Sequence, residues 1–352
     1  MRDDFDCRDC IKVDEFSKIL STVAPELVAV LEDRYNILTM ISYLQPIGRR
    51  SLSSKLNITE RVIRKEANTL KEQGLVDFSL EGMTVTPEGE TVLETLKLMF
   101  HDLKGLKTIE QKLAEVLNIQ KVIIGAAGTQ DEDYEMKELG RSAAQYLAEC
   151  MTDGNVVGVT GGTSVFSVIE AFKSEKKTYE NAIVVPARGG LGKKTEFQAN
   201  TLVEKLADKL GSQYRMLYTP DNLSQTAIES LRNEPEIREI TEILGKMNML
   251  VFGIGEALTM AKRRSLEAEE IETIIQKGAV SEAFGYYFNA KGEIVHEIST
   301  IGIDLEIFKS LDELIAVAAG EGKADAIISI CRLNPNLVLV TDEKVARKIL
   351  HT

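Results

Sequence analysis

Apolar residues return along this chain at two different spacings, which divide it into two parts. From Pro25 to about Leu117 they recur every three or four residues, as on amphipathic helices. From about Ile119 onward, short apolar runs alternate with helical stretches, a pattern typical of a parallel sheet with helices on both faces. The pattern predicts a mainly helical N-terminal part and a larger α/β part.

The N-terminal part predicts a small domain of helices and one hairpin. Proline, glycine and capping residues mark where its elements begin and end. The expected elements are, in order, a helix from Pro25 to Pro46, a short helix with Ser51 as N-cap, a helix from Thr59 to about Gln73, and a hairpin of 75–78 with 83–86. This is the order of a winged helix-turn-helix domain, whose hairpin is the wing.

Basic residues gather on these helices although the chain has a formal net charge of −13, which repels nucleic acid on average. On the helix after Thr59, Ile63, Ala67 and Leu70 fall on one side and the basic residues on the other. A basic stripe alone is most often a solvated face, but this order of elements favours DNA recognition. The candidate DNA-binding residues are Arg49, Arg50, Ser51, Arg61, Arg64, Lys65 and Asn68.

A long helix predicted from Pro87 to Leu117 joins the two parts. Its apolar spacing resembles a short coiled-coil seam, weakened by Gly105, and a helix docked on the next domain is the alternative. In both cases it is the expected place for dimer contacts. The expected domains are a mobile extension at 1–24, a DNA-binding domain at 25–92, a helical linker at 93–118 and an effector domain at 119–352.

Short apolar runs after Ile119 predict the strands of a doubly wound parallel sheet. They are 121–124, 156–159, 183–185, 215–217, 249–252, 315–318 and 337–340, with a hairpin around 289–292 inserted before the last strands. In an open α/β sheet, ligands bind beyond the carboxyl ends of the strands. The residues that follow these strands are therefore the place to look for a site.

One of these strand ends runs into a glycine turn and then a helix. The turn consists of Thr160, Gly161, Gly162, Thr163 and Ser164. Such a turn presents free backbone N–H groups to an anion, and glycine lets the ligand come close. Taken by itself, the same sequence is also compatible with a tight strand–helix turn that is capped by a hydroxyl side chain and binds no ligand.

Three further strand ends also carry glycines, and each has a cation nearby. The cations are Arg188, the Lys262-Arg263-Arg264 run and Lys323, and the polar residues Gln198 and Glu282 are suited to sugar hydroxyls. Together the four strand ends predict a pocket for an anionic, hydroxyl-bearing small molecule, most simply a sugar phosphate.

Composition places the chain among globular proteins, since 44% of its 352 residues are apolar and 28% are charged. No apolar run reaches the roughly 20 residues that span a bilayer, and the acidic N-terminus is unlike a signal peptide. A cytoplasmic location without membrane contact is expected. Cys7 and Cys10 form a CxxC in the expected extension. We interpret it as a chance feature of this extension, and a redox or metal-binding role is the minority alternative. No cofactor is expected.

Longer motifs resemble the SorC family of sugar-responsive transcriptional regulators over about residues 25–352. They include Pro46-Ile-Gly-Arg-Arg-Ser-Leu52, Val185-Pro-Ala-Arg-Gly-Gly-Leu-Gly192 and Glu282-Ala-Phe-Gly-Tyr-Tyr-Phe-Asn-Ala290. The resemblance implies a repressor of a glycolytic operon containing glyceraldehyde-3-phosphate dehydrogenase, relieved by fructose 1,6-bisphosphate. It also implies an effector domain related in fold to sugar-phosphate isomerases and glucosamine-6-phosphate deaminase.

The same resemblance implies roles for the site residues. One phosphate is expected on Thr160, Gly162, Thr163 and Ser164 with Arg188 alongside, the second on Arg263 and Lys323, and the sugar hydroxyls on Gln198 and Glu282. Whether Arg263 or Arg264 binds phosphate stays open. Two cationic clusters suit a bisphosphate, because a monophosphate would leave one of them unpaired.

An isomerase or deaminase on the same kind of sheet is the rival class, and a regulator of another sugar phosphate is a second alternative. Enzymes of this kind need a general base, commonly with an acid partner such as histidine. The chain has three histidines, His101, His296 and His351, and none follows a predicted parallel strand. A non-enzyme is therefore expected, with operator DNA, a sugar phosphate and further copies of itself, as dimer or tetramer, as partners.

Overall fold

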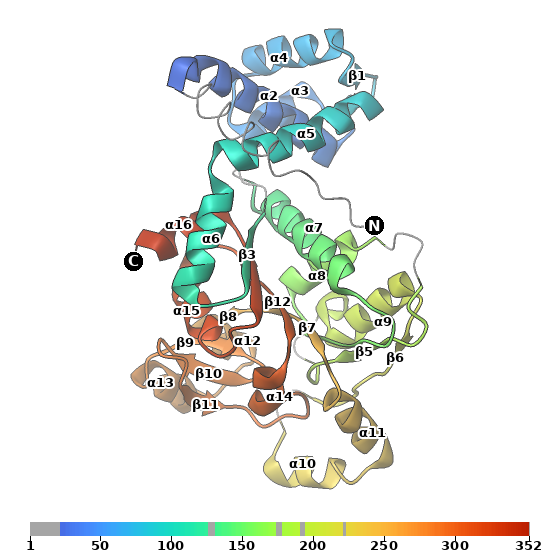
Figure 1. Ribbon diagram of the computed structural model, residues 1–352, viewed down its shortest axis with the longest axis vertical. Helices are drawn as coiled ribbons and strands as arrows, with labels where there is room; N and C mark the ends of the chain where they lie inside the picture. Colours follow the sequence, from blue (N-terminus) through green and yellow to red (C-terminus); the bar gives the residue numbers. More distant parts are fainter. Residues whose placement is uncertain (1–21, 126–130, 174–177, 191–193, 221–222, 352) are drawn as a thin grey trace, which may run out of the picture. The chain divides into compact units, whose positions relative to one another are not determined.

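The chain forms two compact units in a computed structural model that describes residues 22–125, 131–173, 178–190, 194–220 and 223–351 (Figure 1). The smaller unit comprises residues up to Thr108 and a second stretch that ends at Glu135. The larger unit comprises Ile109–Gly125 and the residues from Met136 onward. Cys7, Cys10 and nearly all of the expected extension at 1–24 lie outside the described residues.

The smaller unit contains the helices and the hairpin in the order that the sequence predicted. Its elements are α2 (Pro25–Leu44), α3 (Arg49–Leu56), α4 (Glu60–Glu72), β1 (Val76–Phe78), β2 (Met83–Val85) and α5 (Pro87–Leu103). Ser51 as N-cap was wrong, because Gly48 is the N-cap of α3 and its carbonyl already accepts the N–H of Leu52 at 3.0 Å. Asn57 ends α3 with a left-handed φ of 52°, and Thr59 precedes α4.

The apolar faces of these helices meet in one core. Ile63, Ala67 and Leu70 of α4 are buried there, as the helical projection predicted. They pack with residues of α2 and α3 that include Ile37, Leu38, Ile41 and Leu52. Because α4 uses this face for packing, its opposite face is left to solvent or to a partner.

The joining segment is two helices, so the prediction of a single helix from Pro87 to Leu117 was wrong. The helix α5 ends at Leu103, Gly105 adopts a left-handed φ of 63°, and α6 (Leu106–Leu117) follows. A residue with a Cβ would be strained at this φ, and the helical hydrogen-bonding pattern is interrupted there. Leu106, Leu113 and Leu117 of α6 are buried, as in a helix docked on neighbouring structure.

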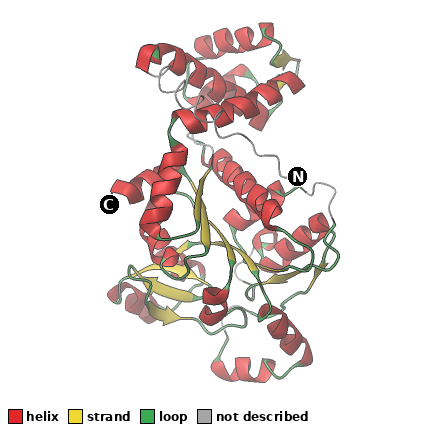
Figure 2. Ribbon diagram, viewed as in Figure 1, coloured by secondary structure: helices red, strands yellow, loops and turns green. Residues whose placement is uncertain are grey.

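The described residues of the larger unit form a seven-stranded parallel sheet with helices on both sides (Figure 2). Its strands are β3 (Lys121–Ile124), β4 (Val156–Val159), β5 (Ile183–Pro186), β6 (Gln213–Tyr214), β7 (Met249–Gly253), β12 (Glu313–Val317) and β13 (Leu337–Thr341). The predicted strand at 215–217 was misplaced. The Asn200 side chain accepts the backbone N–H of Leu217 and donates to its carbonyl oxygen, both at 3.0 Å. The strand therefore ends at Tyr214.

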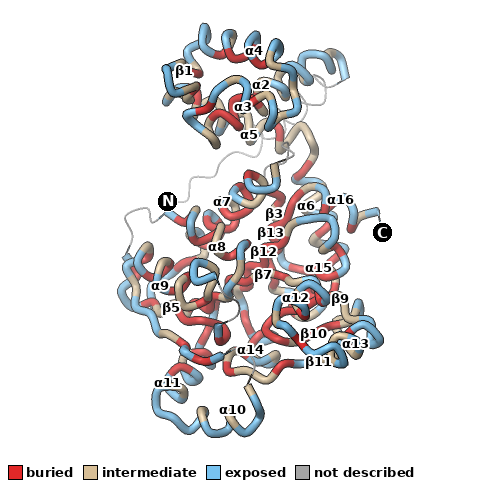
Figure 3. Tube along the Cα trace, turned by 180° about the vertical axis from the view of Figure 1, so that it is seen from behind, coloured by how far each residue is buried: buried red, intermediate tan, exposed pale blue. Residues whose placement is uncertain are grey.

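Helices α7 (Glu132–Cys150), α8 (Thr163–Ala171) and α9 (Ala199–Leu210) share one core with the central strands. Figure 3 shows buried residues concentrated along β13, β12 and β7. The remaining helices are α10 (Gln225–Leu231), α11 (Pro235–Leu244), α12 (Ala257–Arg263), α13 (Ala268–Gln276), α14 (Leu305–Ser310), α15 (Ala324–Cys331) and α16 (Glu343–His351).

A second sheet of antiparallel strands follows β7 directly. Among the described residues its order is β11-β10-β9-β8, with bounds β8 (Gly255–Glu256), β9 (Ala279–Ala283), β10 (Tyr286–Asn289) and β11 (Ile294–Glu297). The predicted hairpin is confirmed as β10 and β11. Strand β9 escaped prediction because two polar residues, Ser281 and Glu282, are buried in it.

The strand order of the parallel sheet reverses between β4 and β7. From β4 the chain continues outward through β5 and β6, whereas from β7 it continues the other way through β12 and β13. Such a reversal leaves a crevice at the carboxyl ends of the two adjacent strands, which is where open α/β sheets bind ligands.

Candidate functional site

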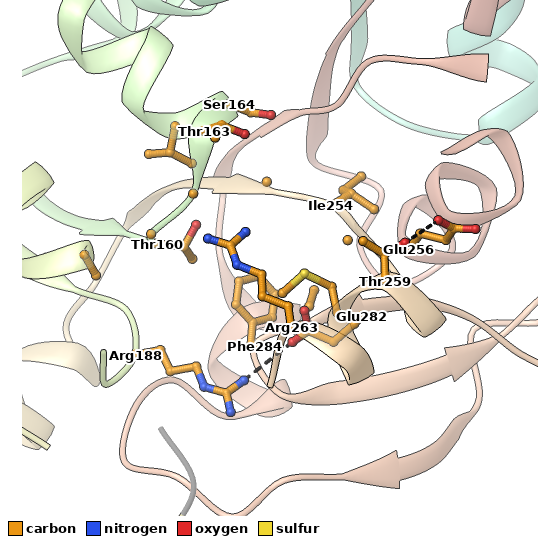
Figure 4. A pocket seen from close by; sticks show the side chains of 18 of the residues that line it. Thr160, Thr163, Ser164, Arg188, Ile254, Glu256, Thr259, Arg263, Glu282 and Phe284 are labelled. Atoms are coloured by element: carbon orange, nitrogen blue, oxygen red, sulfur yellow. Dashed lines mark hydrogen bonds and ion pairs between the residues drawn. The ribbon is translucent and has the colours of Figure 1, made fainter. Parts of the chain in front are cut away.

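A cavity of about 310 Å³ opens at this reversal, beyond the carboxyl ends of β4 and β7 (Figure 4). Its walls come from the β4–α8 turn, the residues after β5, the β7–α12 segment, β9 and the 3-10 helix η2 (Glu321–Lys323). Of the residues predicted from sequence, it brings together Thr160, Gly161, Gly162, Thr163, Ser164, Arg188, Arg263, Glu282 and Lys323. Gln198 is not among the lining residues; it precedes α9, whose first residue Ala199 does line the cavity.

The β4–α8 turn, which we call the cradle, has the form of an anion-binding turn. Gly162, with a φ of 126°, is the N-cap of α8, and no side chain caps this helix end. A Cβ on Gly161 would stand 2.7 Å from the carbonyl oxygen of Phe197, so only glycine fits there. The first backbone N–H groups of α8 have no partner within the helix. The buried Thr160 Oγ1 also lacks a hydrogen-bond partner among the described residues, so these groups are available to a ligand.

Two arginines share one buried carboxylate on the opposite wall. Glu282 is 3% exposed, and its Oε1 lies 2.6 Å from Arg264 Nη2 and 3.5 Å from Arg188 Nη1. The backbone N–H of Gly285 donates to the same oxygen at 2.7 Å. This Arg188–Glu282–Arg264 cluster carries one positive charge in excess.

A second cationic region is formed by Arg263 and Lys323. Figure 4 shows the Arg263 guanidinium within the pocket, on the side of Thr160. Burial lowers the pKa of Lys323 below its ordinary value of 10.5, and the charge of Glu256 partly opposes this shift. An ammonium with little solvation gains from an anionic ligand. The pocket therefore has two cationic regions, which suits a ligand with two anionic groups.

The sequence reasoning missed the contribution of α12 to the pocket. Thr259 and Met260 line the cavity beside Arg263, and Thr259 donates its hydroxyl proton to Glu256 at 2.7 Å. Residues 256, 259, 260 and 263 follow the three-and-four spacing of one helical face. That spacing was the available signal. In the described part of the chain no group of histidine, cysteine, aspartate and glutamate side chains is arranged to hold a metal ion.

The exposed face of α4 carries the predicted DNA-binding residues. Arg61, Arg64, Lys65 and Asn68 are exposed there, and Arg64 Nη2 contacts Glu60 Oε1 at 3.1 Å. Arg50 and Ser51 are exposed on α3. The guanidinium of Arg49 and the ammonium of Lys71 lie 5.4 and 4.7 Å from the Phe78 ring centroid. These contacts fix the hairpin against α3 and α4, so helices and hairpin present one surface.

None of the helices in the described ranges is both long and apolar enough to cross a membrane.

Two family profiles match the chain, and together they cover most of it. Residues 101–351 match a sugar-binding domain, and residues 30–100 match the CggR N-terminal DNA binding domain. The central glycolytic genes regulator of Bacillus subtilis is 43% identical over 326 residues, which are 93% of this chain and 96% of that protein. Its namesake from Priestia megaterium is 40% identical over 327 residues, 93% of this chain and 95% of that protein.

Solved structures of regulators are similar as well. A SorC family transcriptional regulator from Enterococcus faecalis is 34% identical, with a TM-score of 0.64 over 69% of this chain and 99% of that one. The full-length sorbitol operon regulator SorC from Klebsiella pneumoniae is 17% identical, with a TM-score of 0.65 over 89% of this chain and 96% of that one. The second likeness concerns the fold alone.

Proposed function

Because this chain belongs to the SorC family of transcriptional regulators, we propose that it represses a glycolytic operon and that fructose 1,6-bisphosphate relieves the repression. Its relatives and structural neighbours are DNA-binding regulators rather than enzymes, and so is this chain. The operon would include the glyceraldehyde-3-phosphate dehydrogenase gene, and the protein would act in the cytoplasm.

The pocket with two cationic regions is the observation that carries the choice of effector. One phosphate binds the cradle formed by Thr160 and the first turn of α8, with Arg188 beside it. The second phosphate binds Arg263 and Lys323. Glu282 and Gln198 hold sugar hydroxyls, the latter from just outside the present lining. A bisphosphate pairs both cationic regions, whereas a monophosphate leaves one of them desolvated and unpaired.

The exposed face of α4 is the proposed DNA-reading surface, within a winged helix-turn-helix domain. Arg61, Arg64, Lys65 and Asn68 read bases or phosphates in the major groove, and Arg49, Arg50 and Ser51 contact the backbone. A dimer or tetramer presents paired α4 helices to two operator half-sites. The effector weakens binding only if it favours a subunit arrangement that fits the operator less well.

A fluorescence-anisotropy titration onto DNA from upstream of the chain's own operon tests this function. It is run at fixed salt, because binding to DNA depends strongly on salt, with and without millimolar fructose 1,6-bisphosphate. We expect tight binding that loosens or loses cooperativity with the sugar, and inorganic phosphate at the same concentration is the control. Tight DNA binding that does not change with fructose 1,6-bisphosphate would favour another sugar phosphate as the effector. Absence of DNA binding would favour the enzyme hypothesis.

A further inference from the structure

Adjacent arginines at the end of α12 lie in different surroundings. Arg263 is exposed and enters the pocket, whereas the Arg264 side chain is 5% exposed and pairs with Glu282. We propose that Arg264 is a positioning residue of the effector pocket, which acts through Glu282 on Arg188 and is not itself a phosphate ligand. This inference rests on the proposed function, since it concerns how the same pocket keeps a charge ready for phosphate.

Glu282 is the point through which Arg264 acts. Arg264 Nη2, the backbone N–H of Gly285 and Arg188 Nη1 all approach the same oxygen, Oε1, at 2.6, 2.7 and 3.5 Å. Arg264 makes the shorter of the two ion pairs and Arg188 the longer. The carboxylate is therefore held mainly by Arg264, and Arg188 keeps more of its charge for a ligand.

The position of Arg188 is confined by its surroundings. The residue is 7% exposed, and its backbone forms an isolated bridge with Gly302. Gly285 has a φ of 86°, and a Cβ there would overlap the Arg188 guanidinium. Because the guanidinium lies against this turn, Arg188 is held beside Glu282, with Nη1 at 3.5 Å from Oε1.

Charge balance gives the inference its test. Two cations and one carboxylate leave one positive charge on this wall of the pocket. If Arg264 becomes methionine, Glu282 forms its ion pair with Arg188 alone and neutralises the charge of Arg188. If Glu282 also becomes glutamine, no carboxylate at this position pairs with Arg188, and the charge of Arg188 is again available to phosphate. A residue that only stabilises the fold, or that touches phosphate itself, would not show this recovery.

The experiment measures binding of inorganic phosphate and of fructose 1,6-bisphosphate to the full chain, by calorimetry and by ligand-induced shifts in Tm. The variants are Arg264→Met, the double variant Arg264→Met with Glu282→Gln, and Lys262→Met. Lys262 is exposed on the same helix and does not line the cavity, so Lys262→Met is the matched control. Inorganic phosphate has no sugar hydroxyls, so a hydroxyl-binding role of Glu282 does not affect it.

We expect Arg264→Met to weaken phosphate binding about tenfold or more, as loss of a charged hydrogen bond does. The double variant should recover most of it, and Lys262→Met should bind like the wild type. Unchanged binding in Arg264→Met, or a folded double variant that stays as weak as Arg264→Met, would overturn the proposal. Should Arg264→Met not fold, Arg264→Gln, which also removes the charge but can still donate a hydrogen bond to Glu282, takes its place in both variants.

Failure of the proposed function would appear differently. A wild type that binds inorganic phosphate but not fructose 1,6-bisphosphate disproves the effector and leaves the Arg264 series measurable with phosphate. A wild type that binds both but shows no recovery in the double variant leaves the effector in place and removes the positioning role.

Discussion

Asp131 Oδ2 lies 2.7 Å from the ammonium of Lys55, a residue 76 positions earlier in the chain. Its other oxygen, Oδ1, accepts the backbone N–H of Tyr134 at 3.1 Å. One carboxylate thus caps the start of α7 and holds α3 in the DNA-binding unit. The hydrogen bond from Lys55 keeps the pKa of Asp131 below its ordinary value of 3.8.

Two substitutions at Asp131 separate its roles. Asp131→Asn keeps a capping oxygen and loses the ion pair, whereas Asp131→Ala loses both. We expect Asp131→Ala to destabilise the DNA-binding unit by about 1 kcal/mol and Asp131→Asn by less than about half of that. Since the pKa is lowered on folding, the ion pair contributes above the unfolded value of 3.8 and is lost as the pH falls through the lower folded value. Melting curves between pH 7 and pH 3 check this: the gap between wild type and Asp131→Asn should close in acid, and a constant gap contradicts it.

Arg64 is predicted to contribute to operator binding. Arg64→Ala should weaken binding by roughly tenfold, because one base or phosphate contact is lost. Arg347→Ala is the matched control, since Arg347 forms the same kind of exposed pair with the glutamate four residues before it. Anisotropy titrations at several salt concentrations measure both. Equal curves for Arg64→Ala and wild type would remove α4 from the proposed interface.

Arg188 is predicted to serve the effector and not the DNA. Arg188→Ala should bind the operator like the wild type but lose the response to fructose 1,6-bisphosphate. Arg215→Ala, which removes a half-exposed arginine paired with Glu239 at 2.9 Å, is the control. The operator titration is repeated with and without the sugar. An undiminished response in Arg188→Ala would show that the pocket is assigned wrongly.

Gly162 is predicted to matter for both backbone and ligand. Gly162 and Gly154 have φ values of 126° and 91°, and a Cβ on either would meet nothing within 4 Å. Alanine at either position should cost about 1–2 kcal/mol of stability through backbone strain. Only Gly162→Ala should also weaken effector binding, because only Gly162 lies in the cradle. Calorimetry of both variants decides, and equal affinities would argue against phosphate binding at α8.

Lys323 is predicted to make effector affinity sensitive to alkaline pH. Burial lowers its pKa below 10.5, and an anionic ligand binds the charged form. The affinity for fructose 1,6-bisphosphate should therefore fall as the pH rises through this lowered pKa. Lys323→Arg keeps its charge at these values and should flatten the profile. Binding constants measured from pH 7 to pH 10 test this, and parallel profiles for the two proteins would contradict it.

Features decided by short-range pattern could be predicted from the sequence. The face of α4, the strand bounds near Val156 and the glycine turn after it depend on residues close together in the chain. The break at Gly105 and the end of β6 were misjudged, because a left-handed glycine and the distant Asn200 side chain decide them. Local periodicity carries no information about either.

The same limit applies inside the pocket. The sequence does not decide whether Arg263 or Arg264 binds phosphate, because two adjacent arginines fit the same sequence pattern. Their surroundings differ through Glu282, which comes from a strand that the pattern did not predict. Burial of a charged residue depends on a partner distant in sequence, and so it becomes visible only in the fold.

The DNA-binding unit is not one uninterrupted stretch of chain, and this affects any attempt to transplant it. Tyr134 belongs to that unit, is buried in its core, and has its ring centroid 5.3 Å from that of Tyr43. A gene fragment that stops at Thr108 would encode a domain that lacks the buried Tyr134 ring and the ion pair between Asp131 and Lys55 of α3. A chimera that joins this DNA-binding unit to another effector domain must therefore replace the contacts of Asp131 and Tyr134. Without them the DNA-binding unit would be less stable.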